Sequence, residues 1–230
     1  MYGFYGIDMS YIILTVVTLV LGLAAQGYIT STYKKWSRVP SPGGKSGAEM
    51  ARNMLASAGA TSVGIGRIEG TLTDNYDPRD NTLHLSEENF SGGSVASIAV
   101  ACHEAGHAIQ TAQGYAPIRF RTALVPVVSF SQQFWSLLFL GGILLNVMGL
   151  IYAAIALFAF SVLFSLVTLP VEIDASRRAV AYISQYGSGI DQQGAKSVLT
   201  AAALTYVAAA LTCILQLLYL LAQVNGRRRD

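Results

Sequence analysis

The sequence predicts a mostly α-helical membrane protein with about four transmembrane helices and a small α+β domain. Three observations indicate this fold class. Of the 230 residues, 53% are hydrophobic and only 12% are charged, about half the charged fraction of an ordinary soluble domain. Several apolar runs are long enough to cross the roughly 30 Å hydrocarbon core of a bilayer as helices. Residues 30–122, by contrast, carry strand patterns, turns and helix caps.

The charge and the cysteine content argue against two other classes of protein. The net charge is only +2 and the basic residues are scattered along the chain, which argues against nucleic acid as a partner. Cys102 and Cys213 are the only cysteines, too few for a disulfide framework.

Residues 1–29 are predicted to contain the first transmembrane helix. The run from Ile7 to Tyr28 is apolar and long enough to span. A signal peptide would start with basic residues, and the segment before this run has none. A basic cluster follows directly at Lys34, Lys35 and Arg38. Because basic residues beside a span favour the cytoplasm, we expect the N-terminus to lie outside.

Residues 30–122 are predicted to form the catalytic domain, which begins with a capped helix and a small sheet. Ser46 and Glu49 match a capping box, and Gly59 supplies a left-handed stop. Residues 63–68 and 71–85 alternate as strands do, and the second stretch folds back at a polar turn. An edge strand of such a sheet can pair with an extended polypeptide through its main chain.

A helix capped by Ser94 is predicted over residues 95–113, and it contains the pattern His-Glu-x-x-His at His103, Glu104 and His107. Residues four apart share a helix face, so both imidazoles can bind one ion while Glu104 reaches a water on its open side. This is the layout of zinc hydrolases. The alternative is a chance pair of histidines, but two of the three histidines in the chain fall here, with small residues between them. The pattern therefore predicts bound Zn²⁺.

Two other residues could bind the metal, and for each a different role is favoured. His84 lies in a predicted strand, where alternation favours a side chain that faces solvent. Cys102 points about 100° away from His103 around the helix, so we interpret it as a packing residue.

The apolar stretch at residues 123–169 is too long for one crossing. Small and turn-forming residues occur near its middle, at Gly141, Gly142, Asn146 and Gly149. We therefore expect a transmembrane hairpin of two helices with its turn on the outer side. Residues 170–197 then return to the side of the motif helix, and residues 198–225 form a fourth transmembrane helix. Arg227 to Arg229 follow that helix and oppose the orientation that the other basic residues favour.

The returning segment offers a third metal ligand. A catalytic zinc site needs three protein ligands and an open position. Glu172 and Asp174 follow the hairpin directly, and either could supply the missing ligand. The alternative is a pair of carboxylates in the first turn of a helix, where negative charge is favoured.

At residues 72–79, 103–110 and 170–178 the chain resembles the neutral zinc metallopeptidase family of bacterial membrane proteins, the YugP type, and the resemblance covers nearly the whole chain. It is more distantly similar to HtpX-like membrane proteases and CAAX prenyl endopeptidases, which place transmembrane helices between the motif and a glutamate ligand on a later helix. The resemblance implies a gluzincin-like metallopeptidase domain with Glu172 as the third ligand. Those relatives have Glu-x-x-x-Asp where this chain has Glu-x-Asp, so Asp174 is expected to support the site by holding a histidine ring through its distal N–H.

The resemblance also implies zinc-assisted hydrolysis of peptide bonds, with Glu104 as the general base. A donor to the oxyanion is expected nearby, and the candidates are Tyr76, Arg177, Arg178 and Tyr182. For the two arginines, anchoring at the membrane surface is an equal alternative.

Two functions remain open at this point. The first is an integral-membrane zinc endopeptidase that acts on membrane or membrane-proximal polypeptides. The second is a non-proteolytic, zinc-stabilised membrane adaptor or scaffold. Glu104 favours the first, because a structural zinc site has no use for a base and usually closes with four ligands. Expected partners are a polypeptide substrate, the lipid bilayer, and other membrane proteins or a second copy. Basic residues beside the spans predict a multi-pass protein of the cell membrane with its active site in the cytoplasm.

Overall fold

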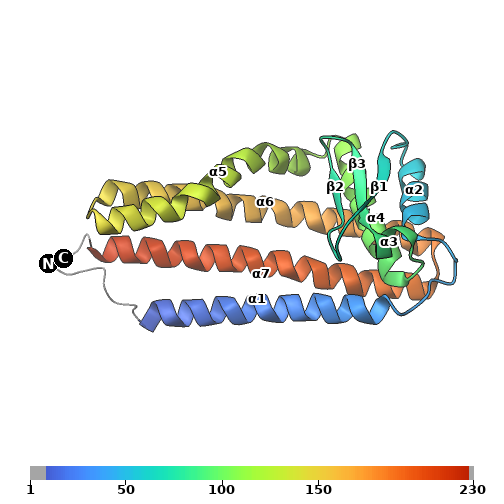
Figure 1. The fold of residues 1–230 in the computed structure, drawn as a ribbon, viewed down its shortest axis with the longest axis horizontal. Coiled ribbons are helices and arrows are strands. Elements are labelled where there is room, and N and C mark those ends of the chain that lie inside the picture. Colours follow the sequence, from blue (N-terminus) through green and yellow to red (C-terminus); the bar gives the residue numbers. More distant parts are fainter. Residues whose placement is uncertain (1–8, 228–230) are drawn as a thin grey trace. The chain divides into compact units, whose positions relative to one another are not determined.

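The structure is a computed structural model that describes residues 9–227, with side chains described up to residue 225. In chain order its elements are α1 (Met9–Trp36), α2 (Gly47–Ser57), β1 (Gly64–Ile68), β2 (Asn75–Asp77), β3 (Thr82–Ser86), α3 (Glu87–Ser91), α4 (Val95–Ala112), α5 (Ala116–Leu144), α6 (Met148–Tyr186) and α7 (Gly189–Arg227) (Figure 1). In this described part, α1, α5, α6 and α7 are long and apolar enough to cross a membrane. The predicted fold class, a mostly α membrane protein with a small α+β region, is confirmed.

The chain separates into two compact units. One unit holds the chain up to residue 24, residues 120–169 and the chain from residue 206 on, while the other holds residues 25–119 and 170–205. The first is called the apolar unit and the second the motif unit. Helices α1, α5, α6 and α7 each contribute residues to both.

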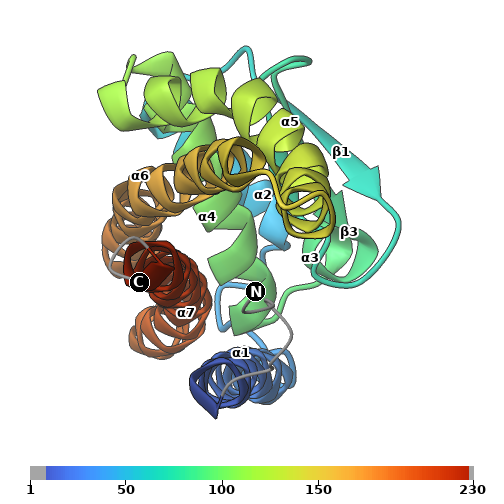
Figure 2. The ribbon, with the colours of Figure 1, turned by 90° about the vertical axis from the view of Figure 1, so that its left-hand side faces the viewer.

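The apolar unit is built from helix segments, which Figure 2 shows nearly end-on. Its core includes Ile151 and Phe158 of α6 and Leu220 of α7, and the ring of Trp135 in α5 lies 4.9 Å from that of Phe158. Many large apolar side chains of these helices are exposed, which suits helices surrounded by lipid rather than water. A short turn with Asn146 at φ +54° separates α5 from α6.

The motif unit contains a three-stranded sheet in the order β1-β3-β2, in which β1 runs parallel and β2 antiparallel to β3. The sheet lies against α4 (Figure 1). Leu83 and Leu85 of the central strand are fully buried in the core that α2 and α4 share. The sheet therefore fixes β2 as an edge strand beside the motif helix.

Local sequence signals place the two helices of this core as expected. Ser46 and Glu49 exchange the hydrogen bonds of a capping box at the start of α2, and Gly59 follows that helix at φ +73°. At the start of α4, the hydroxyl of Ser94 accepts a hydrogen bond from the backbone N–H of Ser97. These caps satisfy N–H groups that a helix leaves without partners.

Within the motif unit, α4 packs closely against the second half of α6. A Cβ atom at Gly106 would lie 2.8 Å from the carbonyl oxygen of Ala175 and 3.1 Å from its Cα. Only glycine allows this approach without moving the backbones apart. The contact lies between His103 and His107 on one helix and faces the segment that carries Glu172 on the other.

One interpretation of the returning segment is wrong. Glu172 and Asp174 do not lie in the first turn of a helix, because α6 begins at Met148 and continues through Pro170 to Tyr186. A carboxylate in the interior of a helix gains nothing from the positive helix N-terminus. The burial of Glu172, whose exposed fraction is 2%, therefore needs another explanation.

Candidate metal centre

Three buried side chains converge in the motif unit. Oε2 of Glu172 on α6 lies 3.2 Å from Nε2 of His103 and 3.5 Å from Nε2 of His107, both on α4. One ligand atom from each residue lies within 4.8 Å of those of the other two. The exposed fractions are 9%, 6% and 2% for His103, His107 and Glu172. The cluster is therefore sheltered from bulk water.

This donor set fits a zinc ion. Two imidazole nitrogens and one carboxylate oxygen are common ligands of catalytic zinc, which leaves a fourth position open. Ligand atoms held at about 2.0–2.2 Å around a tetrahedral ion lie about 3.3–3.6 Å apart, close to the two separations from Glu172. A buried carboxylate also needs a positive partner. A divalent cation bound by the two imidazoles and Glu172 would be such a partner.

The outer nitrogen of each imidazole has its own partner. Nδ1 of His103 lies 3.2 Å from Oγ of Ser176, and Nδ1 of His107 lies 3.1 Å from Oε1 of Gln110. When Nδ1–H donates to these oxygens, the tautomer leaves a lone pair on each Nε2 for the ion. These two contacts therefore orient both rings for metal binding.

Asp174 supports the cluster differently from the expectation. It does not hold a histidine ring directly, because its Oδ2 accepts a 2.8 Å hydrogen bond from the side-chain amide of Gln110. The same amide donates to the backbone oxygen of Val171, also at 2.8 Å. Arg178 donates to Asp174 at 2.6 Å, and the two form an ion pair. Asp174 therefore acts on His107 through Gln110.

Glu104 lies beside the three converging side chains without belonging to them. Its Oε2 accepts a 3.0 Å hydrogen bond from the backbone N–H of Tyr76 on β2. Burial raises the pKa of Glu104 to about 7. A general base is most effective when its pKa lies near the working pH. This carboxylate therefore suits proton transfer at neutral pH.

The four candidate oxyanion donors lie in different surroundings. The hydroxyl of Tyr76 contacts Oδ1 of Asn81 at 3.0 Å, and the backbone N–H of Tyr76 donates to Glu104. Arg178 forms an ion pair with Asp174. Within the described part of the chain, neither Arg177 nor Tyr182 makes a hydrogen bond to the converging ligands. The structure therefore brings together the predicted ligands and Glu104, but not the full set of proposed donors.

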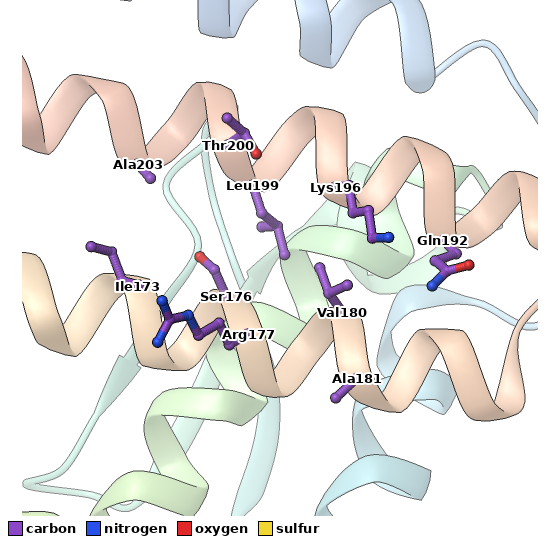
Figure 3. A pocket seen from close by; sticks show the side chains of 10 residues that line it. All are labelled: Ile173, Ser176, Arg177, Val180, Ala181, Gln192, Lys196, Leu199, Thr200 and Ala203. Atoms are coloured by element: carbon purple, nitrogen blue, oxygen red, sulfur yellow. The ribbon is translucent and has the colours of Figure 1, made fainter.

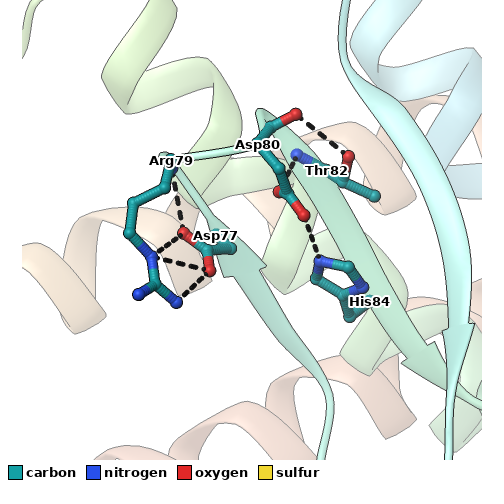
Figure 4. A network of polar contacts seen from close by, with 5 residues as sticks. All are labelled: Asp77, Arg79, Asp80, Thr82 and His84. Atoms are coloured by element: carbon teal, nitrogen blue, oxygen red, sulfur yellow. Dashed lines mark hydrogen bonds and ion pairs between the residues drawn. The ribbon is translucent and has the colours of Figure 1, made fainter.

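The third histidine has a structural partner. Nε2 of His84 lies 2.9 Å from Oδ2 of Asp80 (Figure 4). Asp80 also accepts from the backbone N–H of Thr82, while Asp77 pairs with Arg79 in the same turn (Figure 4). His84 thus stabilises the connection between β2 and β3 and lies outside the metal cluster.

Cys102 is fully buried in the core of the motif unit, next to His103 in sequence. Burial raises the pKa of its thiol far above the ordinary value. Because the thiolate is the metal ligand, a thiol with such a pKa is a packing residue.

Two supporting residues were not found from the sequence. Gln110 follows His107 by three positions and Ser176 follows Glu172 by four, so each shares a helix face with a ligand. That spacing is the signal that could have found them. It is weak by itself, because many polar residues on a helix have such neighbours.

The described residues define the class of protein by two features. They contain four helices apolar enough to span a membrane, and a buried set in which Glu172 of α6 meets the two histidines of the His-Glu-x-x-His pattern on α4. The chain belongs to a zinc metallopeptidase family, whose model, described as "Putative neutral zinc metallopeptidase", matches residues 11–225. It is similar to "Putative membrane protease YugP" of Bacillus subtilis (strain 168), with 43% identity over 222 residues that cover 95% of this chain and 99% of that protein. No solved structure matches the chain. The predicted family is confirmed, and the chain is a multi-pass membrane protein.

Proposed function

We propose that this protein is an integral-membrane zinc endopeptidase that hydrolyses peptide bonds of membrane or membrane-proximal polypeptides. In this proposal His103, His107 and Glu172 hold the zinc ion, and Glu104 is the general base. The single observation that carries it is the convergence of three buried ligands with a second carboxylate, that of Glu104, beside them. A purely structural zinc site would use four protein ligands and would have no role for Glu104.

The proposed hydrolysis of a peptide bond gives each residue of the site a separate role. A bound zinc ion supplies a Lewis acid that polarises a peptide carbonyl and lowers the pKa of water. Glu104 takes the proton of the attacking water and passes it to the leaving amine. The N–H of Tyr76 holds Oε2 of Glu104 in place, so the other carboxylate oxygen can carry the proton. Ser176 and Gln110 keep the imidazoles in the tautomer that binds metal.

The edge of the sheet supports a polypeptide as the substrate. β2 pairs with β3 on one side only, and its Tyr76 N–H points to Glu104 rather than to β3. A peptide in extended conformation could pair with the remaining main-chain groups of this edge. Its backbone would then lie beside the general base.

Replacing the general base tests the proposal. In Glu104→Gln the shape is kept and the base is removed, so we expect proteolysis to fall by at least about 100-fold while zinc stays bound. The purified full-length chain would be assayed by casein digestion, and its zinc measured by elemental analysis. Glu69→Gln, which changes an exposed glutamate, is the matched control. Loss of zinc in Glu104→Gln, or near-normal turnover, would contradict the role given to Glu104.

We also propose that the active site faces the cytoplasm. The support comes from basic residues next to the predicted spans, at Lys34, Lys35, Arg38, Arg119, Arg121, Arg177 and Arg178. In a variant without Cys102 and Cys213, a single cysteine at Asn146 should react with an impermeant reagent added outside intact cells. A cysteine at Asp80 should not react. The reverse result would show the opposite orientation, and labelling of both would contradict the two-helix hairpin.

A further inference from the structure

A groove lies between α6 and α7 in the motif unit, and the function proposed above does not use it. The two helices are joined by the short turn at residues 187–188 and line the groove from opposite sides (Figure 3). Its volume is about 430 Å³. This is enough space for a polar headgroup together with the start of an alkyl chain.

The charged side chains that line the groove are both positive. Arg177 on α6 and Lys196 on α7 both line it, and its lining includes no carboxylate. Within the described residues, neither of these two cations makes an ion pair or a hydrogen bond. The side chains of Gln192 and Thr200 add neutral hydrogen-bond donors. An anion with several oxygen atoms would satisfy these groups.

Apolar side chains line the groove beside its cations. Gln192 and Lys196 line it near the turn between the helices, whereas Ile173 and Ala203 line the opposite end, toward which the Arg177 side chain extends (Figure 3). Beyond that end, α6 and α7 continue into the stretches that are apolar enough to span a membrane. Ile173 and the neighbouring Leu204 are 37% and 43% exposed. A ligand that fits both ends carries an anionic group and an alkyl chain.

We propose that this groove binds an anionic phospholipid, with the headgroup phosphate at Arg177 and Lys196 and an acyl chain along Ile173 and Ala203. Basic pockets between membrane helices recognise anionic headgroups in this way, and long basic side chains reach from apolar helix surfaces to the headgroup level. Ser176 lines the same groove and contacts Nδ1 of His103. The bound headgroup therefore lies directly behind a ligand of the proposed metal centre.

Native mass spectrometry of the full-length chain in detergent tests the proposal. The protein would be offered phosphatidylglycerol and phosphatidylcholine at equal concentration, and the retained lipid would be counted per chain. We expect the anionic lipid to be retained in preference. The double variant Arg177→Gln/Lys196→Gln should lower its retention by about tenfold or more. Lys34→Gln/Lys35→Gln, which removes two basic residues at the end of α1, is the matched control and should retain lipid normally.

A second variant separates loss of the site from loss of the fold. Ala203→Trp keeps both cations but fills the apolar end, so it should also lower retention of the anionic lipid. Circular dichroism and thermal unfolding would check that each variant is folded. Equal retention of both lipids, or unchanged retention in the folded groove variants, would overturn the proposal. So would a dimer in the same spectra that the groove variants abolish while lipid stays bound, because the groove would then be an interface between two copies.

Discussion

The two histidines of the metal centre are held in different ways. The outer nitrogen of His103 contacts one hydroxyl, that of Ser176. The outer nitrogen of His107 contacts Gln110, which is fixed in turn by Asp174 and by the backbone of Val171. One ring thus depends on a single neutral contact, and the other on a connected network that ends in an ion pair with Arg178.

The site gains its rigidity from one segment of α6. Ser176, Asp174 and Val171 all belong to the same part of α6 as Glu172. In the proposed site, that segment supplies the third ligand, Ser176 on it contacts the ring of His103, and Asp174 on it fixes Gln110, which contacts the ring of His107. The close contact between Gly106 and Ala175 holds the two helices at the required separation.

The largest expected effect comes from a change that displaces both histidines of α4 from the segment of α6 that contacts them. In Gly106→Ala, the added Cβ would meet the backbone of Ala175 at 2.8 Å, so α4 and α6 must move apart. Zinc affinity should fall by more than about 100-fold, and stability by about 1–3 kcal/mol. Gly22→Ala, where nothing lies within 4 Å of the added atom, is the control. Competition titration with a zinc chelator measures the affinity, and an unchanged value would show that the close contact is not needed.

A smaller effect is expected from the network behind His107. Gln110→Ala removes the acceptor of the Nδ1 proton and the link to Asp174, so zinc affinity should weaken by about 10–100-fold. The control is Gln193→Ala, which changes an exposed glutamine of α7. The same chelator titration gives the result. If Gln110→Ala binds zinc as tightly as the control does, the network does not orient His107.

The contact behind His103 should matter less. Ser176→Ala removes one neutral hydrogen bond, which is worth about 0.5–1.5 kcal/mol, or about 2–10-fold in zinc affinity. Ser184→Ala, which changes an exposed serine of the same helix, serves as the control. If zinc affinity falls as much in Ser176→Ala as in Gln110→Ala, or more, then the contact behind His103 matters at least as much as the network behind His107.

The smallest effect is expected at Cys102. Its thiol is buried, and burial raises its pKa, so it should neither bind zinc nor react with an alkylating reagent in the native protein. Cys102→Ala should keep its full zinc content. Mass spectrometry after treatment with N-ethylmaleimide should find Cys102 modified only after unfolding. Rapid modification of the native chain would show that this part of α4 is open to solvent.

Local signals predicted the local structure. The caps at Ser46 and Ser94 and the stop at Gly59 each depend on neighbours within a few residues. The positions of His103, Glu104 and His107 follow from helix periodicity for the same reason. These features could be read before any tertiary contact was known.

The features of the fold and of the site that could not be predicted depend on contacts between residues far apart in the sequence. Spacing alone did not choose between Glu172 and Asp174; the choice came from the family resemblance. The continuation of α6 through Pro170 was not predicted, because proline inside a helix removes a hydrogen bond and usually marks an end. Ser176 lies 73 positions from His103, and no local pattern joins the two. Asp174 was expected to contact a histidine ring directly, but Gln110 lies between Asp174 and the ring of His107.

The most direct test of the account is the zinc content of Glu172→Ala. In the proposed site, this carboxylate completes a set of ligands that the two histidines of α4 cannot supply alone. Elemental analysis of the purified chain should find about one zinc per chain in the unchanged protein and in the control Glu69→Ala, which removes an exposed carboxylate. Glu172→Ala should contain almost none. One tightly bound zinc per chain in Glu172→Ala would contradict the central claim.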